Sequence, residues 1–195
     1  MYEFFIELQK CLSNLVEFKP LSKIEKIVAI DVAYKGDFGF SVAVVFDIDK
    51  NKLLEEKFVK GKVIFPYIPT LLFLREAPLV LQVLKKMESD YDLIVIDGHG
   101  LAHPRKAGIA TIVGIITKKP TIGIAKKFLY GEVKDNVIYV DGQKIGLIFG
   151  KYFASIGSNI DFHSLKSFLE KLNFKYPEAL KIADKLSKAF AKNSS

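Results

Sequence analysis

The amino-acid sequence predicts an α/β protein built around one mixed β-sheet with helices packed on it. The first half of the 195-residue chain holds three successive strand patterns separated by short turns, the order of an antiparallel meander. The middle of the chain alternates strand, helix and strand, which is the order of parallel strands joined by a helical crossover. Half of the residues are hydrophobic, so the chain can bury a core of ordinary size.

The amino-terminal elements follow from hydrophobic periodicity. Residues 2–18 have the amphipathic pattern of a helix, and residues 26–34 form an apolar run typical of a central strand. Turn residues at 35–39 connect this run to a second strand at 40–49, which predicts a hairpin. Residues 52–65 alternate well enough to form the third, edge-like strand of the meander.

The segment PYIP at 66–69 interrupts this pattern, because its two prolines stiffen the backbone and prevent regular strand pairing. A helix is predicted over 71–87 and a buried strand over 92–97. A short apolar helix at 108–117 leads to another strand at 121–126, so this part of the chain is a strand–helix–strand unit with parallel strands.

The rest of the chain predicts a hairpin, a short strand and two helices. An Asp-Gly dipeptide lies between two apolar runs in 137–149, which is a strong hairpin signal. A short strand at 152–157 follows, and helices are predicted near 161–172 and 177–191.

This order of elements, three antiparallel strands and then parallel strands flanked by helices, is that of the ribonuclease H-like architecture. No linker, internal repeat or low-complexity segment divides the sequence. We therefore expect a single domain over 1–195, with a frayed tail near 192–195.

Charge and composition narrow the class of partner. The formal net charge of +7 and the sequence pI near 9.3 favour a polyanion such as nucleic acid, although heat-adapted proteins are also rich in lysine. Cys11 is the only cysteine, which excludes an intrachain disulfide and a cysteine-based zinc site. No apolar run reaches the ~18 residues of a membrane span and the start of the chain lacks a signal-peptide pattern, so we expect a cytoplasmic protein without a membrane partner.

Three carboxylates occupy positions where the surrounding pattern favours apolar side chains. Asp31 lies inside an apolar strand, and Asp97 ends the next buried strand. Glu76 falls within the apolar arc of helix 71–87 when its residues are placed at ~100° intervals. Each residue also has an ordinary structural explanation. Asp31 could be bonded to a neighbouring backbone group or Lys, Asp97 could be a helix cap or turn former, and Glu76 could pair with a core-facing Lys or Arg.

Taken together, the three carboxylates predict a metal site. They converge if the two strands are neighbours and the helix packs on them. Clustered carboxylates repel one another, so such a site holds together best around a hard divalent cation. Mg²⁺ keeps several waters and commonly bridges to phosphate, which suits phosphodiester hydrolysis.

Two other patterns are weaker. GHGLAH at 98–103 begins like a dinucleotide-binding fingerprint, but His103 stands at the third glycine position and Pro104 follows where a helix should run. His99 and His103 are four residues apart in a Gly/Pro loop, where surface histidine is a better interpretation than a zinc site.

Four segments of the chain resemble, in order and spacing, the signature segments of the endonuclease V family. They read AIDVAY, PYIPTLLFLREAP, VIDGHGLAHPRKAGIA and PTIGIAKKFLYG, and the similarity resumes at ASIGSNID and KYPEALKIAD. That family comprises deoxyinosine 3′ endonucleases of DNA repair with a ribonuclease H-like fold. The resemblance therefore implies this fold, Mg²⁺ as cofactor with Mn²⁺ able to substitute, and inosine-containing DNA as partner.

The resemblance also implies roles for charged residues. Asp31 and Asp97 match metal-binding aspartates, Glu76 matches the catalytic glutamate, and Lys126 matches a lysine near the scissile phosphate. Asp184 matches a position that carries His or Asp near the metal. Helical spacing alone places Asp184 at the edge of a polar face, where it would be solvated.

Groups that contact the lesion are implied in the same way. The wedge that inserts beside the damaged base matches Pro66, Tyr67, Ile68 and Pro69, with Tyr67 as the intruding aromatic. The pocket for the flipped base matches Leu72, Gly98, Gly108 and Ile109, whose glycines let the backbone approach the base. His103 and Arg105 match a loop that faces the lesion and the nucleic-acid backbone.

The chain departs from the family pattern at several places. Thr70 stands where the family often has glycine, and the segment between Gly131 and Ser155 matches poorly. Ser158 precedes Asn159 in place of the more frequent glycine-containing pair.

The carboxylates and the basic charge predict a phosphodiester-cleaving enzyme, and the resemblance implies a monomeric DNA-repair endonuclease that flips deoxyinosine and hydrolyses the second phosphodiester bond on its 3′ side. The products would carry 3′-hydroxyl and 5′-phosphate ends. Two alternatives stay open: an inosine-specific endoribonuclease acting on single-stranded RNA, and a non-catalytic nucleic-acid-binding module. A metal-free structural protein would show no effect of Mg²⁺ on its melting temperature.

Overall fold

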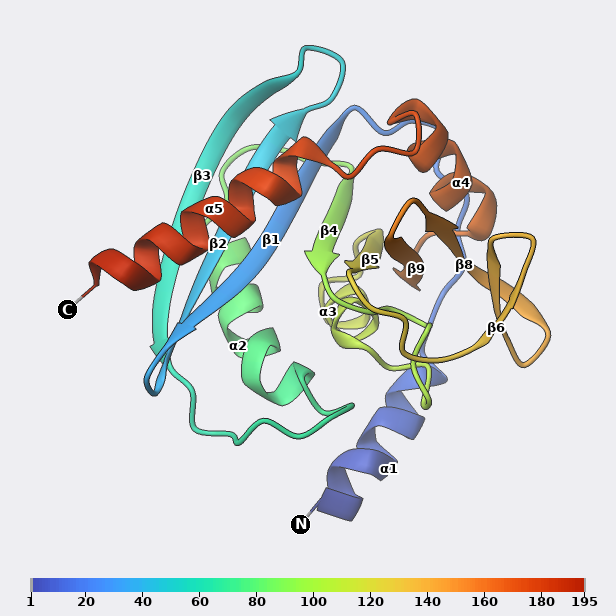
Figure 1. Ribbon diagram of the computed structural model, residues 1–195, viewed down its shortest axis with the longest axis horizontal. Coiled ribbons are helices and arrows are strands. Elements are labelled where there is room, and N and C mark those ends of the chain that lie inside the picture. The colour runs from blue at the N-terminus through green and yellow to red at the C-terminus, as the bar shows by residue number, and fades with distance from the viewer. Residues whose placement is uncertain (1, 195) are drawn as a thin grey trace.

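The computed structural model describes residues 2–194, and its first half is an antiparallel meander (Figure 1). The meander consists of β1 (Lys26–Lys35), β2 (Phe38–Asp47) and β3 (Lys52–Lys62), paired in that order as predicted. β2 is buried along almost its whole length, because strands flank it on both sides and helices cover both of its faces. β3 ends at Lys62, before the predicted end at residue 65.

The parallel part of the sheet begins on the other side of β1. There β1 pairs with β4 (Leu93–Asp97), and β4 pairs with β5 (Thr121–Ala125). The crossover between β4 and β5 contains α3 (Ile109–Thr117). The predicted strand–helix–strand unit is therefore confirmed.

The sheet continues beyond β5 with antiparallel strands. β9 (Tyr152–Ser158) pairs with β5, and β8 (Gln143–Phe149), β7 (Val137–Val140) and β6 (Glu132–Lys134) follow outward. The Asp-Gly dipeptide forms the predicted turn between β7 and β8, with positive φ at both residues. The strand order of this nine-stranded sheet in the described residues is β3-β2-β1-β4-β5-β9-β8-β7-β6, which confirms the mixed ribonuclease H-like arrangement.

Helices cover both faces of the sheet. α2 (Phe73–Leu84) and α3 pack on one face, and α4 (Phe162–Lys171) and α5 (Glu178–Asn193) pack on the other. Because strand side chains alternate, Ile27 and Ala29 of β1 join the core under α4 and α5, whereas Val28 and Ile30 join the core under α2 and α3. Figure 1 shows α5 crossing in front of the meander and α2 behind it.

The helices at the two ends of the chain have other bounds than those predicted. α1 (Tyr2–Ser13) packs near α3 and ends at Ser13, where residues up to 18 were predicted to be helical. A frayed tail was predicted near 192–195, but α5 continues through Asn193, so residues 192 and 193 are helical. Residue 195 lies outside the described residues, and fraying there stays a prediction. Among residues 2–194, no helix is both long enough and apolar enough to cross a membrane.

Candidate active site

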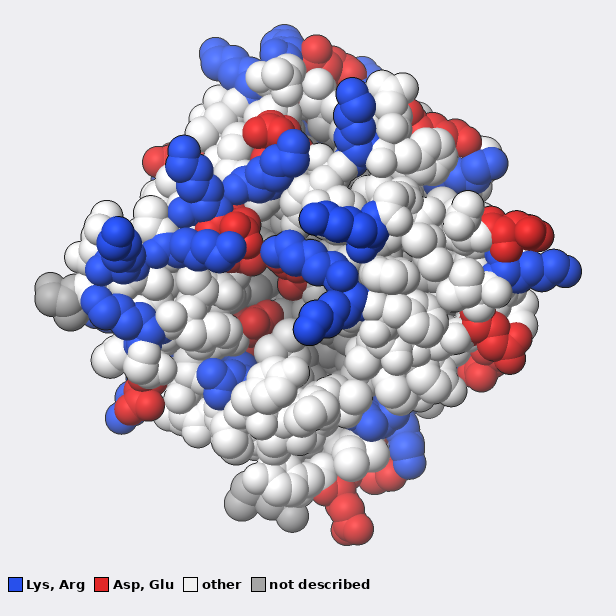
Figure 2. All heavy atoms as spheres, in the orientation of Figure 1, with Lys and Arg blue, Asp and Glu red and all other residues white. Residues whose placement is uncertain are grey.

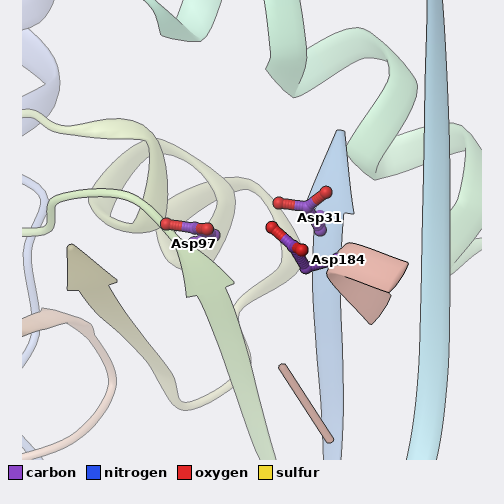
Figure 3. Close-up of side chains that lie close together, drawn as sticks. All are labelled: Asp31, Asp97 and Asp184. Carbon is purple, nitrogen blue, oxygen red and sulfur yellow. The ribbon is translucent and has the colours of Figure 1, made fainter. Parts of the chain in front are cut away.

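Two of the predicted aspartates lie where the parallel pairing of β1 and β4 ends. Ile30 of β1 is in register with Ile96 of β4, so Asp31 and Asp97, each one residue further along, come together. Carboxylate oxygens of these two residues and of Asp184 all lie within 4.8 Å of one another. Figure 3 shows these three side chains gathered in one place.

Asp184 reaches this cluster because α5 packs against β1. Ser187, one turn further along α5, donates a hydrogen bond to Asp31 Oδ2, which ties the helix to the strand. Lys188 Nζ lies 2.6 Å from Asp184 Oδ2. Helical spacing had placed Asp184 at a solvated edge, whereas the structure shows that this edge faces the two strand aspartates.

Lys126, just after β5, lies between two of the carboxylates. Its Nζ is 2.7 Å from Asp97 Oδ2 and 3.3 Å from Asp184 Oδ1. Partial burial would lower the pKa of Lys126, but the hydrogen bond and negative charge of Asp97 outweigh it and hold that pKa above its ordinary value. The ammonium group is therefore charged throughout the physiological pH range.

The charges of the cluster match a bound cation. Burial, together with the charges of Asp97 and Asp184, raises the pKa of Asp31 to about 6. Hydrogen bonds from Lys188 and Lys126 outweigh the effect of burial at Asp184 and lower its pKa. An all-oxygen donor set, in which neighbouring carboxylates disfavour ionisation of a buried one, fits a hard divalent cation that would relieve this repulsion.

Glu76 lies beside this cluster and not within it. Its side chain is buried on α2, and Oε1 accepts a hydrogen bond of 2.8 Å from the Tyr34 hydroxyl. Burial, reinforced by the charges of Asp31 and Asp97, raises the pKa of Glu76 to about 8. The sequence predicted that Asp31, Glu76 and Asp97 would converge, whereas Asp184 takes the third place among the oxygens that could share one ion.

The PYIP segment forms an irregular, exposed loop between β3 and α2. The Tyr67 side chain is 67% exposed, and the prolines on either side of the Tyr-Ile pair are exposed as well. Ile68 is partly buried against the core under α2, which anchors the loop. Arg75 Nη1 donates to Phe65 O at 2.6 Å and holds the start of the loop. This arrangement leaves an aromatic ring projecting from a braced backbone.

A cavity of 280 Å³ lies next to this loop. Three of the four residues predicted for the base pocket, Leu72, Gly108 and Ile109, line the cavity together with Tyr67. Gly98 does not line it, and a Cβ there would lie 2.7 Å from Ile109 Cγ2. A Cβ on Gly108 would lie 2.2 Å from the His99 carbonyl oxygen, so the glycine is required by backbone packing.

His103 points inward, which differs from its predicted contact with the nucleic-acid backbone, whereas Arg105 is partly exposed. The His103 side chain is 3% exposed, its Nε2 lies 3.0 Å from Thr70 O, and its Nδ1 accepts a bond from the Arg105 backbone N–H. Burial lowers the pKa of His103 to about 4, so the ring is neutral at pH 7 and brings no charge to a phosphate. The Arg105 guanidinium is bonded to Gln9 and Thr70.

The weaker sequence patterns are not supported by the geometry. Among residues 2–194, the Asp31, Asp97 and Asp184 cluster is the group of His, Cys, Asp or Glu side chains close enough to share an ion, and it contains no histidine. α3 begins at Ile109, too far from the glycines at 98 and 100 to supply the helix of a dinucleotide fingerprint.

Sequence reasoning missed several residues that support the site. Tyr34 donates a hydrogen bond to Glu76, and Ser187 donates one to Asp31. Lys188 donates a hydrogen bond to Asp184. A sequence signal existed for two of them, because Ser187 and Lys188 follow Asp184 by one helical turn. Gln9 is fully buried on amphipathic α1, which is the same kind of misplaced polar residue as Glu76.

Lysines surround the carboxylates on the molecular surface. Figure 2 shows basic side chains over α5 and around a hollow in which acidic side chains lie. The exposed lysines of α5 recur at one-turn spacing, at positions 181, 185, 188 and 192. Lys185 and Lys192 have no ion-pair partner among the described residues.

The sheet order and the carboxylate cluster define a ribonuclease H-like protein with the donor set of a phosphodiester-cleaving enzyme. The family model described as Endonuclease V matches residues 7–185. The chain is 45% identical to an Endonuclease V from Sulfolobus acidocaldarius over 198 residues, covering 98% of this chain and 97% of that relative. It is 46% identical to an Endonuclease V from Sulfurisphaera tokodaii over 196 residues, covering 97% and 96%.

Solved structures agree with these sequence matches. The fold superposes on the Endonuclease V of Streptomyces avermitilis with a TM-score of 0.89 at 30% identity, covering 98% of this chain and 93% of that one. It superposes with a TM-score of 0.86 on Ciona intestinalis Endonuclease V, in complex with a 24mer DNA containing an inosine followed by a ribo-adenosine, at 22% identity and 98% coverage of both chains. The chain belongs to the endonuclease V family and is thus a nuclease, a hydrolase of phosphodiester bonds.

Proposed function

We propose that this protein is a deoxyinosine endonuclease of DNA repair that hydrolyses the second phosphodiester bond 3′ to the lesion. One observation carries the proposal: three carboxylates have oxygens within 4.8 Å of one another, and His99, two residues after Asp97, lines a 280 Å³ cavity together with Tyr67 of the braced loop. The carboxylates suit cleavage, and the loop and cavity suit extraction of a base. The Ciona Endonuclease V, crystallised with inosine-containing DNA, supports the choice of lesion.

Asp31, Asp97 and Asp184 would hold Mg²⁺, with Mn²⁺ able to substitute. The ion would supply Lewis-acid polarisation of the phosphate and activation of water. Ser187 fixes the orientation of Asp31, and Lys188 fixes that of Asp184, so the donor oxygens are positioned before any substrate arrives. The resemblance implied Asp31 and Asp97 as the metal-binding residues, and the proposal adds Asp184.

Lys126 and Glu76 act on the reacting groups. The Lys126 ammonium, already directed at Asp97 and Asp184, would stabilise charge on the scissile phosphate. Glu76, held by Tyr34, would orient the attacking water. Because burial raises the pKa of Glu76 to about 8, its carboxyl group would accept the proton of that water only in the ionised form, whose fraction grows as pH rises toward 8. Water forms the new bond to phosphorus, the bond from phosphorus to the 3′ oxygen breaks, and that oxygen takes up a proton to leave 3′-hydroxyl and 5′-phosphate ends.

Base recognition would use the wedge loop, defined as Pro66 to Pro69, and the adjoining cavity. Tyr67 would occupy the space that the flipped base leaves in the stack. Leu72, Gly108 and Ile109 would contact the base, whereas Gly98 would act indirectly by letting Ile109 pack closely.

A cleavage assay tests the proposed function. Inosine-bearing DNA and RNA oligonucleotides, each as duplex and as single strand, are incubated with Mg²⁺ and separately with EDTA. We expect nicking of inosine DNA at the second bond on the 3′ side, lost in EDTA and absent from adenine controls. Preferential cleavage of single-stranded inosine RNA would favour the endoribonuclease alternative, and binding without cleavage would favour the non-catalytic module.

A further inference from the structure

Thr70, the residue that follows the wedge loop, has an unusual backbone conformation. Its φ is 68°, in the left-handed region that a β-branched residue rarely adopts. Glycine, which has no Cβ, enters this region without steric cost. A threonine therefore needs compensating contacts to keep this conformation.

Three side chains supply those contacts by converging on the Thr70 carbonyl oxygen. Gln9 Nε2 donates at 3.0 Å and Arg105 Nη2 at 3.1 Å. His103 Nε2 lies 3.0 Å away, and because its Nδ1 accepts from a backbone N–H, Nε2 is the donor in the neutral ring. Arg105 also donates to the Thr70 hydroxyl oxygen. We call Gln9, His103 and Arg105 the Thr70 clamp.

Gln9 joins the clamp to two other parts of the molecule. It is fully buried, its Nε2 also donates to Ala107 O at 2.8 Å, and its Oε1 accepts from Arg105 Nε at 2.7 Å. Each polar atom of this amide is used. α1 is thereby connected to the end of the wedge loop, 61 residues away, and to the loop before α3, 98 residues away.

The clamp also borders the cavity proposed for the base. Gln9, Thr70 and His103 line this cavity, as do Tyr67 and Pro69 of the wedge loop. A displacement of Thr70 would therefore move the loop that carries Tyr67 relative to the cavity.

We propose that the Thr70 clamp positions the wedge loop for base extrusion from duplexes, with Gln9 and Arg105 as positioning residues. This inference rests on the proposed function. Extruding a base from a duplex requires unpairing and unstacking, against which the wedge must be held firmly. A single strand offers little such resistance, so the clamp matters less there. Arg105, which is partly exposed, would act through its bonds to Gln9 and Thr70, where the resemblance had implied contact with the nucleic-acid backbone.

The test compares Gln9→Met and Arg105→Lys with the unmodified protein on inosine DNA as duplex and as single strand. Met keeps the size of Gln and removes its hydrogen bonds. Lys keeps the charge of Arg but lacks the guanidinium group that donates to Gln9 and Thr70 at the same time. We expect kcat/KM for the duplex to fall by about 10- to 100-fold, since small misplacements have effects of that size, and a much smaller fall for the single strand. Gln82→Met, the same change at an exposed position on α2, is the matched control and should change neither value.

A second readout follows the base directly. With 2-aminopurine next to the inosine, the rise in fluorescence on binding reports unstacking, and both clamp variants should show a smaller rise on the duplex. Equal losses on duplex and single strand, or no loss in either variant, would overturn the inference. If Gln9→Met does not fold, as its melting curve would show, Arg105→Lys decides by the same comparison. An unmodified protein that cleaves neither substrate would instead overturn the proposed function, and the inference with it.

Discussion

At the scale of single residues, burial disfavours the ionised form of the Glu76 carboxyl group. Its pKa is raised from 4.5 to about 8, so the folded protein holds this proton more tightly than the unfolded chain does. The stability contribution is complete below pH 4.5 and is lost as pH rises through about 8. We therefore expect the melting temperature of the metal-free protein to fall over this range, measured in EDTA by differential scanning calorimetry.

Glu76→Gln provides the control for this pH dependence. Glutamine keeps the contact with Tyr34 and does not ionise, so the variant should lose less stability between pH 5 and 9 than the unmodified protein. The decrease that remains should be confined to lower pH, because the Asp31 pKa of about 6 contributes with the same sign. Superimposable profiles for the two proteins would contradict the burial of a protonated Glu76.

Asp97 provides the second prediction at this scale. Asp97→Asn keeps the shape of the side chain but removes the charge that faces Lys126 and the proposed cation. We expect nicking of inosine DNA to fall by about 10³-fold or more, since a metal contributes several kcal/mol to transition-state stabilisation. Binding of inosine DNA, measured by fluorescence anisotropy, should be retained because the wedge loop and cavity are untouched. Undiminished cleavage would exclude Asp97 from the mechanism.

At the scale of elements, α5 connects the site to the basic surface. One face contributes Asp184 and Ser187 to the carboxylate cluster, and another presents the lysines at 181, 185, 188 and 192 to solvent. These lysines extend over about 16 Å, given ~1.5 Å of rise per residue. Lys181 and Lys188 pair with acidic residues of α5, which leaves Lys185 and Lys192 as the cations of this row available to phosphates.

The double substitution Lys185→Gln and Lys192→Gln tests that role. If both lysines contact duplex phosphates, the slope of log K against log salt should decrease in magnitude by about 2, at ~0.9 per contact. The affinity for inosine and for undamaged duplexes should fall alike, because phosphate contacts carry no sequence information. Lys23→Gln with Lys166→Gln removes two positive charges from exposed, ion-paired lysines elsewhere on the surface, and it controls for the change in net charge. An unchanged salt slope would show that nucleic acid does not follow α5.

Some helices and strands could be predicted from the sequence and others could not. The meander, the strand–helix–strand unit and the hairpin between β7 and β8 were predictable because their periodicity and turn residues are local signals. β6 was missed because its three exposed residues, Glu132–Lys134, carry no burial pattern. α1 ends at Ser13 although apolar residues continue, since Val16 and Leu21 pack on the core from an irregular segment.

For the site, prediction succeeded where a polar residue conflicted with its local pattern. Asp31, Glu76 and Asp97 stood out against apolar neighbours, and the structure places all three in or beside the cluster. The place of Asp184, the inward position of His103 and the bonds of Arg105 to Gln9 and Thr70 depend on how distant segments of the chain pack against one another. No spacing along one element encodes such contacts.

At the scale of the whole molecule, the candidate metal site joins three segments that are far apart in the chain. Asp31 comes from the meander near the start of the chain, and Asp97 comes from the parallel strands in its middle. Asp184 comes from α5, the last helix of the chain. A cation bound to all three would connect both halves of the sheet to α5. Because unfolding separates these segments, a cation bound in this way binds the folded state alone and must stabilise it.

Melting in Mg²⁺ and in EDTA measures this stabilisation. At a free concentration of 100 times Kd, the gain in unfolding free energy is about 2.7 kcal/mol. For a chain of this size, that corresponds to a rise in melting temperature of roughly 5–10 °C. The rise should disappear in Asp97→Asn, and KCl at matched ionic strength should not reproduce it in the unmodified protein. The metal-free structural protein considered from the sequence predicts equal melting temperatures in Mg²⁺ and EDTA, and a rise that persists in Asp97→Asn would place the cation elsewhere.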